Sequence, residues 1–123
     1  MNIYLKALGV LVVSLALSAP VYAFNDIATS DPDAAAISFL QAQNIISGSE
    51  DGLFHPDLSL TRCELTKIAL KVAEITPVPS SSASFADVPT SSWCHEYAYT
   101  ARSHGILNGY PDGTFHPNQP VTE

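Results

Sequence analysis

The stretch GSEDGLFHPD, Gly48–Asp57, returns later in the chain as GYPDGTFHPN, Gly109–Asn118. Setting Phe24 on Phe85 aligns the two copies without a gap, as far as Arg62 on Glu123. The positions that are identical between the copies are concentrated within residues 45–56. A turn needs particular residues for its backbone angles, whereas a helix needs only apolar bulk on one face. The sequence therefore predicts a duplicated unit built around a turn with helical flanks.

Residues 1–23 have the layout of a secretory signal peptide. Lys6 supplies a positive charge, Ala7–Ala19 is an apolar run, and Val21-Tyr22-Ala23 puts small residues at positions −3 and −1 of a cleavage site. The run is shorter than the roughly 20 apolar residues that a membrane-spanning helix needs. An uncleaved anchor is the alternative. We expect export to the cell surface, the cell wall or the periplasm.

The chain is acidic, which bears on its partners. It has 5 Lys and Arg against 12 Asp and Glu, a net charge of −7 that becomes −8 when Lys6 leaves with the signal peptide. So negative a surface repels nucleic acid, and we expect no nucleic-acid partner. An anionic ligand would have to bind at one of the remaining cations, which are Arg62, Lys67, Lys71 and Arg102.

In each copy the pattern predicts a first helix followed by a fixed turn. In copy one the helix opens at Asp31-Pro32-Asp33, since proline and acidic residues suit a first turn, and it ends at Asn44. Asn44 aligns with Gly105, and these two residue types most readily adopt the left-handed conformation that ends a helix. The following apolar residues read as short buried extended pairs and core aromatics: Ile45-Ile46, Ile106-Leu107, Phe54 and Phe115.

A second helix begins after the first turn. Thr61 and Glu64 form a T-x-x-E capping box. An apolar stripe at helical spacing predicts the buried face of this helix, namely Leu65, Ile68, Ala69 and Val72. After it, the Pro/Ser-rich residues 76–84 read as an extended linker.

Taken in order, these motifs resemble the S-layer homology module. The opening F-x-D occurs as FNDIA and FADVP, and the loop and T-R-A-E box occur as NIISGSEDGLFHPDLSLTRCEL and GILNGYPDGTFHPNQPVTE. The resemblance covers essentially the whole chain after the signal peptide, apart from the linker. It implies a mainly α fold of helix–loop–helix repeats, which normally form a pseudo-threefold three-module prism with a central helical bundle.

The resemblance also divides the chain into a signal peptide (1–23), module 1 (24–75), a linker (76–84) and module 2 (85–123). The second copy stops at Val121-Thr122, which corresponds to Leu60-Thr61. We therefore expect module 2 to be truncated before its second helix, to leave the apolar face of its first helix uncovered, and to belong to a fragment of a longer protein. A short form completed by another chain is the alternative.

Arg62 is the main candidate site residue. In the family resembled, the arginine of the T-R-A-E box holds a negatively charged cell-wall glycan, often one with a pyruvate ketal. A guanidinium offers a planar, always-charged fork to a carboxylate, and Arg62 stands at the start of a helix, where backbone N–H groups are unpaired. The alternative is that Arg62 pairs with Glu64 or a neighbouring acid and only stabilises the module. Copy two has Glu123 in place of the arginine, which argues against a second equivalent site.

Four further residues are weaker candidates for ligand binding. Asp26 and Asp87, in the two F-x-D openings, either cap the first helix of each copy or line the same groove. Trp93 and Tyr110 either stack on sugar rings or are ordinary residues of the module.

Cys63 stands where the family usually has alanine, and Cys94 is the other cysteine of the chain. In an exported protein the two are candidates for a disulfide, with two unpaired thiols as the alternative. We expect no metal and no cofactor. The Asp51 loop lacks a bidentate Glu at the twelfth calcium-loop position, and His55 and His116 each stand without neighbouring ligands.

No catalytic motif occurs, so we expect this segment not to be an enzyme. The leading hypothesis is non-covalent anchoring of an exported protein to a cell-wall polymer, either a pyruvylated polysaccharide or a peptidoglycan-linked glycan. Its partners would be that glycan or peptidoglycan and further modules of the same or another chain. The alternatives are a structural spacer or assembly domain of an envelope or outer-membrane protein, and the wall-targeting part of a truncated wall hydrolase.

The signal-peptide hypothesis predicts that the exported protein begins at Phe24, because cleavage follows Ala23. Intact-mass measurement of the secreted material checks this. Envelope-associated protein that retains residues 1–23 would contradict it.

Overall fold

The computed structural model describes residues 24–122, and the signal-peptide prediction lies outside this range. Within it there are three helices and no strand: α1 (Ala34–Ala42), α2 (Arg62–Val72) and α3 (His95–Ser103). The predicted mainly α fold of helix and loop repeats is confirmed. None of the described helices has the length and hydropathy to cross a bilayer.

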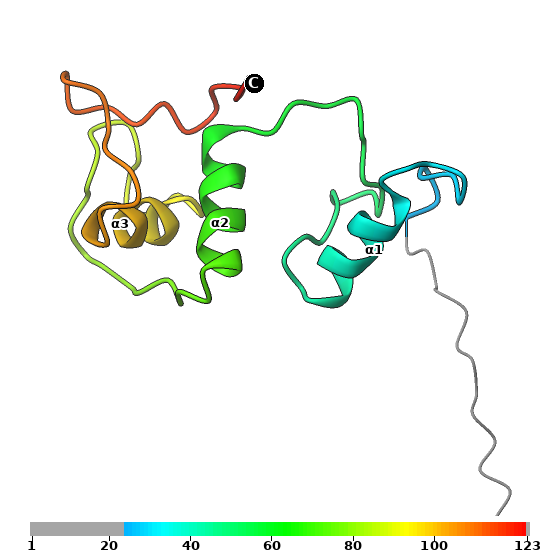
Figure 1. Cartoon of the computed structure of the whole chain (residues 1–123). Helices are drawn as coiled ribbons and strands as arrows, with labels where there is room; N and C mark the ends of the chain where they lie inside the picture. The colour runs from blue at the N-terminus through cyan, green and yellow to red at the C-terminus, as the bar shows by residue number, and fades with distance from the viewer. Residues whose placement is uncertain (1–23, 123) are drawn as a thin grey trace, which may run out of the picture.

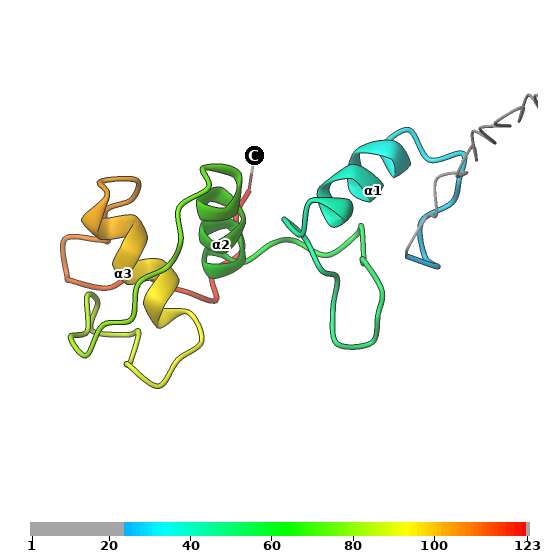
Figure 2. The ribbon, with the colours of Figure 1, turned by 90° about the horizontal axis from the view of Figure 1, so that it is seen from below.

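The described chain forms two lobes (Figures 1 and 2). Residues 24–60 surround α1, and residues 61–122 surround α2 and α3. Each lobe has its own apolar core. The first is made by Phe24, Ile27, Ala34 and Ile37, with Ile46 and Phe54 packed against it. The second is made by Cys63, Phe85, Val88, Cys94, Ala98 and Phe115, with Leu107 packed against it.

The opening phenylalanine of each copy packs beneath its own turn. Phe24 lies 5.6 Å from Phe54 between ring centroids, and Phe85 lies 5.2 Å from Phe115. A Cβ atom at Gly48 or at the equivalent Gly109 would stand 2.4 Å from the opening ring of its copy. Only glycine fits there, which explains why both copies begin the turn with it.

The packing of α2 differs from the expected helical hairpin. α2 packs against α3 of the second copy, whereas α1 makes no contact with either helix. The amides of Arg62 and Cys63 donate to the carbonyls of Gln119 and Pro117, at 2.9 and 3.0 Å. The apolar face of α3, which the sequence predicted to be uncovered, is therefore covered by a helix of copy one.

Chain connectivity explains why α2, a helix of copy one, packs on copy two; we call this packing the exchange of α2. In copy one the positions equivalent to Pro117 and Gln119 are Pro56 and Leu58, only a few residues before α2 itself. A helix cannot dock its N-terminus onto the segment that leads directly into it. The first loop is accordingly left open, and its Phe54 is half-buried while Phe115 is 1% exposed.

The exchange also changes which face of α2 is buried. The buried residues are Cys63, Thr66 and Leu70, and not the predicted stripe, of which Leu65 and Val72 are 43% and 59% exposed. Both faces have helical periodicity, and the face predicted from the sequence is not the buried one. The capping box of Thr61 and Glu64 is present as predicted.

The local predictions for the first helices and the loops have mixed outcomes. Asn44 and Gly105 follow α1 and α3 with φ of 56° and 68°, as predicted for helix ends. The apolar pairs after them are not fully buried, since Ile106 is 46% exposed, because no further element covers them in the described range. The linker is fixed to α3, because Val78 N donates to Thr100 Oγ1 at 2.9 Å.

Cys63 and Cys94 form a disulfide, which confirms the predicted pairing. It joins the start of α2 to the residue before α3, and the two cysteines are 1% and 2% exposed. The bond therefore fastens the helix of copy one to the core of copy two.

The disulfide closes a loop with a sequence separation of 31 residues. Replacing both cysteines by serine should lower the free energy of unfolding by about 3–4 kcal/mol on chain-entropy grounds. Urea denaturation of the two proteins under non-reducing conditions measures the difference. A double variant as stable as the parent would show that the bond contributes nothing to the packing of α2.

Candidate ligand-binding site

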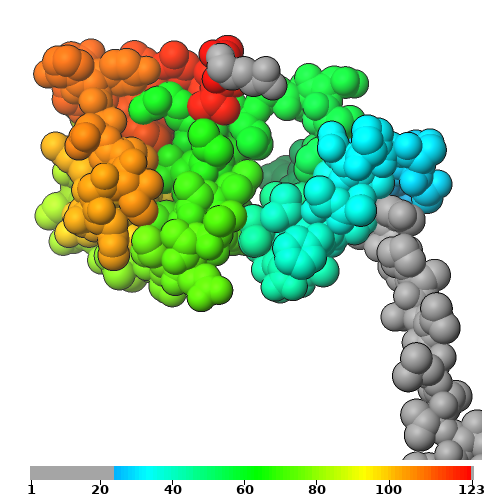
Figure 3. Space-filling view, in the orientation of Figure 1, coloured from blue at the N-terminus to red at the C-terminus, as the bar shows by residue number. Residues whose placement is uncertain are grey.

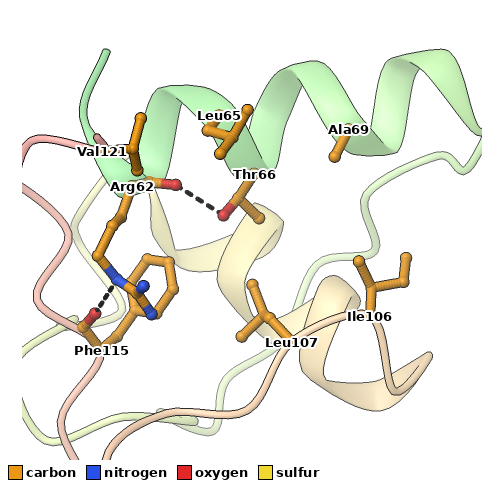
Figure 4. A pocket seen from close by; sticks show the side chains of 8 residues that line it. All are labelled: Arg62, Leu65, Thr66, Ala69, Ile106, Leu107, Phe115 and Val121. Carbon is orange, nitrogen blue, oxygen red and sulfur yellow. Dashed lines mark hydrogen bonds between the residues drawn. The ribbon is translucent and has the colours of Figure 1, made fainter. Parts of the chain in front are cut away.

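A hollow of about 190 Å³ lies where α2 meets the loop that follows α3 (Figure 4). It is lined by Arg62, Leu65, Thr66, Ala69, Ile106, Leu107, Phe115 and Val121. Arg62 is the one charged residue of this lining. The hollow therefore combines a single cation with apolar walls that come from both copies.

The Arg62 side chain is held by the loop of the second copy. Its Nε donates to the carbonyl of Phe115 at 2.8 Å, as Figure 4 shows. Its guanidinium carbon lies 5.0 Å from the centroid of the Phe115 ring and 5.2 Å from that of Tyr110. Contacts of a guanidinium with aromatic faces are attractive and leave its N–H edge available.

The alternative pairing of Arg62 with Glu64 is not found. The Glu64 carboxylate instead accepts from the amide and the hydroxyl of Thr61, both at 2.8 Å. Among residues 24–122 no carboxylate lies within ion-pair distance of Arg62. Glu123, the counterpart of Arg62 in copy two, is outside the described residues.

The expectation of unpaired amides at the start of α2 is wrong. The amides of Arg62 and Cys63 are bonded to the second copy, and that of Glu64 donates to Thr61 Oγ1 at 3.3 Å. They are satisfied because α2 docks end-on against the loop. Anion recognition at this helix end must therefore come from the guanidinium and not from backbone N–H groups.

Asp26 and Asp87 cap neither first helix, so the capping interpretation of them is wrong. The N-cap residues are Asp33 and Cys94, and neither makes a side-chain capping bond. Asp87 instead accepts from the amides of Phe115 and His116, both at 2.7 Å. Asp26 does the same in copy one, at 2.7–3.1 Å. Each carboxylate ties the start of its copy to its turn.

These bonds set the acidity of the two carboxylates. For Asp26, hydrogen bonds from the Phe54 amide lower the pKa below its ordinary value of 3.8. Partial burial raises the pKa of Asp87, but the amides of Phe115 and His116 outweigh it, and the net pKa is also lowered. Both groups are structural anchors of their turns, and only the turn held by Asp87 lines the hollow, through Phe115.

The two aromatic candidates lie in different places. Tyr110 reaches Arg62, as described above. Trp93 is 57% exposed and packs instead on Tyr97, with 6.0 Å between ring centroids and Lys67 Nζ 5.8 Å from its ring. Of the predicted site residues, the structure therefore brings Arg62 and Tyr110 together and places Trp93 and Asp26 elsewhere.

The apolar walls of the hollow were not predicted from the sequence. Ile106 and Val121 line it beside Phe115, although they belong to the other copy and lie far beyond Arg62 in the sequence. No local signal joins them to Arg62, because their proximity follows from the exchange of α2.

Comparison with known families decides what the chain is related to. The model of the S-layer homology domain matches residues 23–66 and 84–123. The chain belongs to the S-layer homology family.

Curated relatives are proteins of bacterial surfaces. The chain is 32% identical over 104 residues to cell surface glycoprotein 1 of Acetivibrio thermocellus, covering 76% of this chain and 4% of the relative. It is 32% identical over 102 residues to the cellulosome-anchoring protein of the same organism, covering 80% and 23%. It is 23% identical over 125 residues to the middle cell wall protein of Brevibacillus brevis, covering 98% and 12%. The predicted exported, cell-surface localisation is confirmed.

A second hollow, of about 650 Å³, lies between the two lobes, where Figure 3 shows the surface to be indented. Its walls are α1 residue Leu40, the first S-layer homology loop and the outer face of α2, including Ile68. It is the open side of copy one, where Phe54 lacks the cover that α2 gives Phe115.

No group of three potential metal-binding side chains occurs in residues 24–122. Asp51, the turn carboxylate considered above as a calcium ligand, is bonded to groups of its own turn. Asp51 accepts from the Leu53 amide at 3.0 Å and contacts His55 Nε2 at 2.7 Å.

The lowered pKa of Asp87 predicts how stability depends on pH. A lowered folded pKa gives stability that is present above the ordinary value of 3.8 and is lost as pH falls through the folded value. Asp87→Asn should therefore lower the free energy of unfolding by about 1 kcal/mol at pH 7, a figure that allows for partial solvent screening. It should also flatten the fall in stability below about pH 4.

Urea denaturation at several pH values measures both effects. Asp57→Asn is the matched control, since Asp57 is exposed and makes no side-chain hydrogen bond in the described chain. An Asp87→Asn protein with the parent's stability and pH profile would contradict the anchoring role.

Proposed function

We propose that the chain anchors an exported protein non-covalently to a cell-wall polysaccharide, with Arg62 as the group that binds a carboxylate of the polymer. One observation carries this proposal. Arg62 is a fixed cation in a surface hollow and has no ion-pair partner within residues 24–122. In a chain with a net charge of −7, this is the place that best suits an anionic ligand.

The walls of the hollow bear on the polymer's chemistry. Leu65, Ile106 and Val121 contribute apolar surface to the hollow that the guanidinium lines. A carboxylate that carries a methyl group, as a pyruvate ketal does, would meet the cation with its charge and the walls with its methyl group. A peptidoglycan-linked glycan bearing carboxylates is the other candidate.

Further S-layer homology modules are the second kind of partner that we propose. The carbonyls of Pro56 and Leu58 are the counterparts of those that receive α2 in copy two. A T-R-x-E helix of another module, in the same or another chain, would therefore fit the open side of copy one. A ring of modules that cover one another in this way is consistent with the family's three-module prism.

The relatives support a binding function and not an enzymatic one. One of them is named a cellulosome-anchoring protein, and the others are surface or wall proteins. The chain spans less than a quarter of each of these relatives, so the activity of a whole protein is a separate matter. A spacer function in the envelope, or wall targeting of a hydrolase, remains as the competing proposal.

Arg62→Ala should weaken binding to purified walls about 10- to 100-fold, because a partly desolvated charge-assisted contact contributes about 1.5–3 kcal/mol. Arg62→Lys should recover only part of the loss, since an ammonium lacks the bidentate fork. Co-sedimentation of the full protein with wall material, native or stripped of its acidic polymer, measures the effect.

Lys71→Ala is the matched control, since it removes one positive charge from the same helix and Lys71 lines neither hollow. It should bind native walls within about twofold of the parent. Circular dichroism must show that each variant folds. If folded Arg62→Ala sediments as well as the parent, Arg62 is structural and the spacer function is favoured.

A further inference from the structure

Tyr110 lies beside Arg62, in the loop that follows α3. Its ring centroid is 5.2 Å from the guanidinium carbon, and its hydroxyl donates to Gln119 Oε1 at 3.1 Å. The His116 ring packs against it, with 4.6 Å between centroids. Tyr110 is therefore held at its hydroxyl and at its ring while it contacts Arg62.

The first copy provides an internal comparison. Ser49 stands in place of Tyr110, and Leu58 stands in place of Gln119. The turn itself is the same, because the amide at the Ser49 or Tyr110 position donates to the equivalent carbonyl, that of Leu53 or Thr114, at 2.8 Å in both copies. The backbone of this loop thus requires neither the tyrosine nor the glutamine.

Both residues occur in the copy whose loop receives Arg62. In copy one the histidine equivalent to His116 has a different contact, since His55 binds Asp51 at 2.7 Å. The tyrosine and its glutamine anchor therefore accompany the arginine and not the turn, whereas the histidine is common to both copies.

We propose that Tyr110 is a positioning residue that fixes the Arg62 guanidinium for ligand binding, an inference that rests on the proposed function of Arg62. The bond from Nε to Phe115 restrains one point of the side chain. The Tyr110 ring restrains the orientation of the guanidinium plane, so that less conformational entropy is lost when a carboxylate binds. Gln119 acts on the same contact by holding the Tyr110 hydroxyl.

This role differs from direct stacking of Tyr110 on a sugar. A stacking residue contributes to binding whether or not Arg62 is present. A positioning residue contributes only through the arginine, so its effect disappears when the arginine is removed. A double-mutant cycle separates the two roles.

The full protein is tested by co-sedimentation with purified walls that carry their acidic polymer. Tyr110→Ser, which installs the residue of copy one, should weaken binding about 3- to 10-fold. Tyr110→Phe keeps the ring but loses the bond to Gln119, so its binding should lie between that of the parent and that of Tyr110→Ser. In an Arg62→Ala background, Tyr110→Ser should cause no further loss. An equal loss in both backgrounds, or no loss in the parent background, would overturn the proposal.

A ligand-free readout separates this proposal from the function of Arg62. The NMR signal of the Arg62 Nε–H group should move and exchange faster with water in Tyr110→Ser, and should move less in Tyr110→Phe, which keeps the ring. Ser49→Tyr, the reciprocal change in copy one, should leave it unmoved. An unchanged signal in Tyr110→Ser would refute positioning. If instead Arg62→Ala binds walls normally, the proposed function of Arg62 fails, whatever the signal shows.

Discussion

The amides of Arg62 and Cys63 donate to carbonyls of the other copy, and much of the molecule follows from that end-on contact. It brings Cys63 to Cys94, so that the disulfide can form, and belongs to the packing of α2 in which Leu70 is fully buried. The same contact sets the Arg62 side chain against the Phe115 carbonyl. Packing, covalent cross-link and candidate site are therefore three consequences of where one helix begins.

Through that contact, the helix of copy one packs on copy two instead of on its own copy. The loop of copy one leads directly into α2, so it must be covered by a helix from elsewhere. The hollow around Arg62 consequently has walls from both copies, and a single copy does not form it. The same constraint leaves the loop of copy one uncovered, and its Phe54 is therefore only half-buried.

Some equivalent positions make the same contacts in both copies, and others make contacts in one copy alone. Asp26 and Asp87 make the same bonds to their turns, and Gly48 and Gly109 admit the same aromatic ring. Within the loops, the residues that differ include Tyr110 and its partner Gln119, which lie where Arg62 of α2 meets copy two.

The sequence by itself determined the local features: the glycine turns, the left-handed helix ends at Asn44 and Gly105, the capping box and the family. These features depend on residues close together in the chain, and the conformational preferences of such residues can be predicted from short motifs. Only the tertiary structure decided which loop α2 covers and which of its two apolar faces is buried. Both loops offer matching carbonyls and both faces have helical periodicity, so no local pattern separates them. Chain connectivity makes that choice, because a loop cannot be covered by the helix it enters.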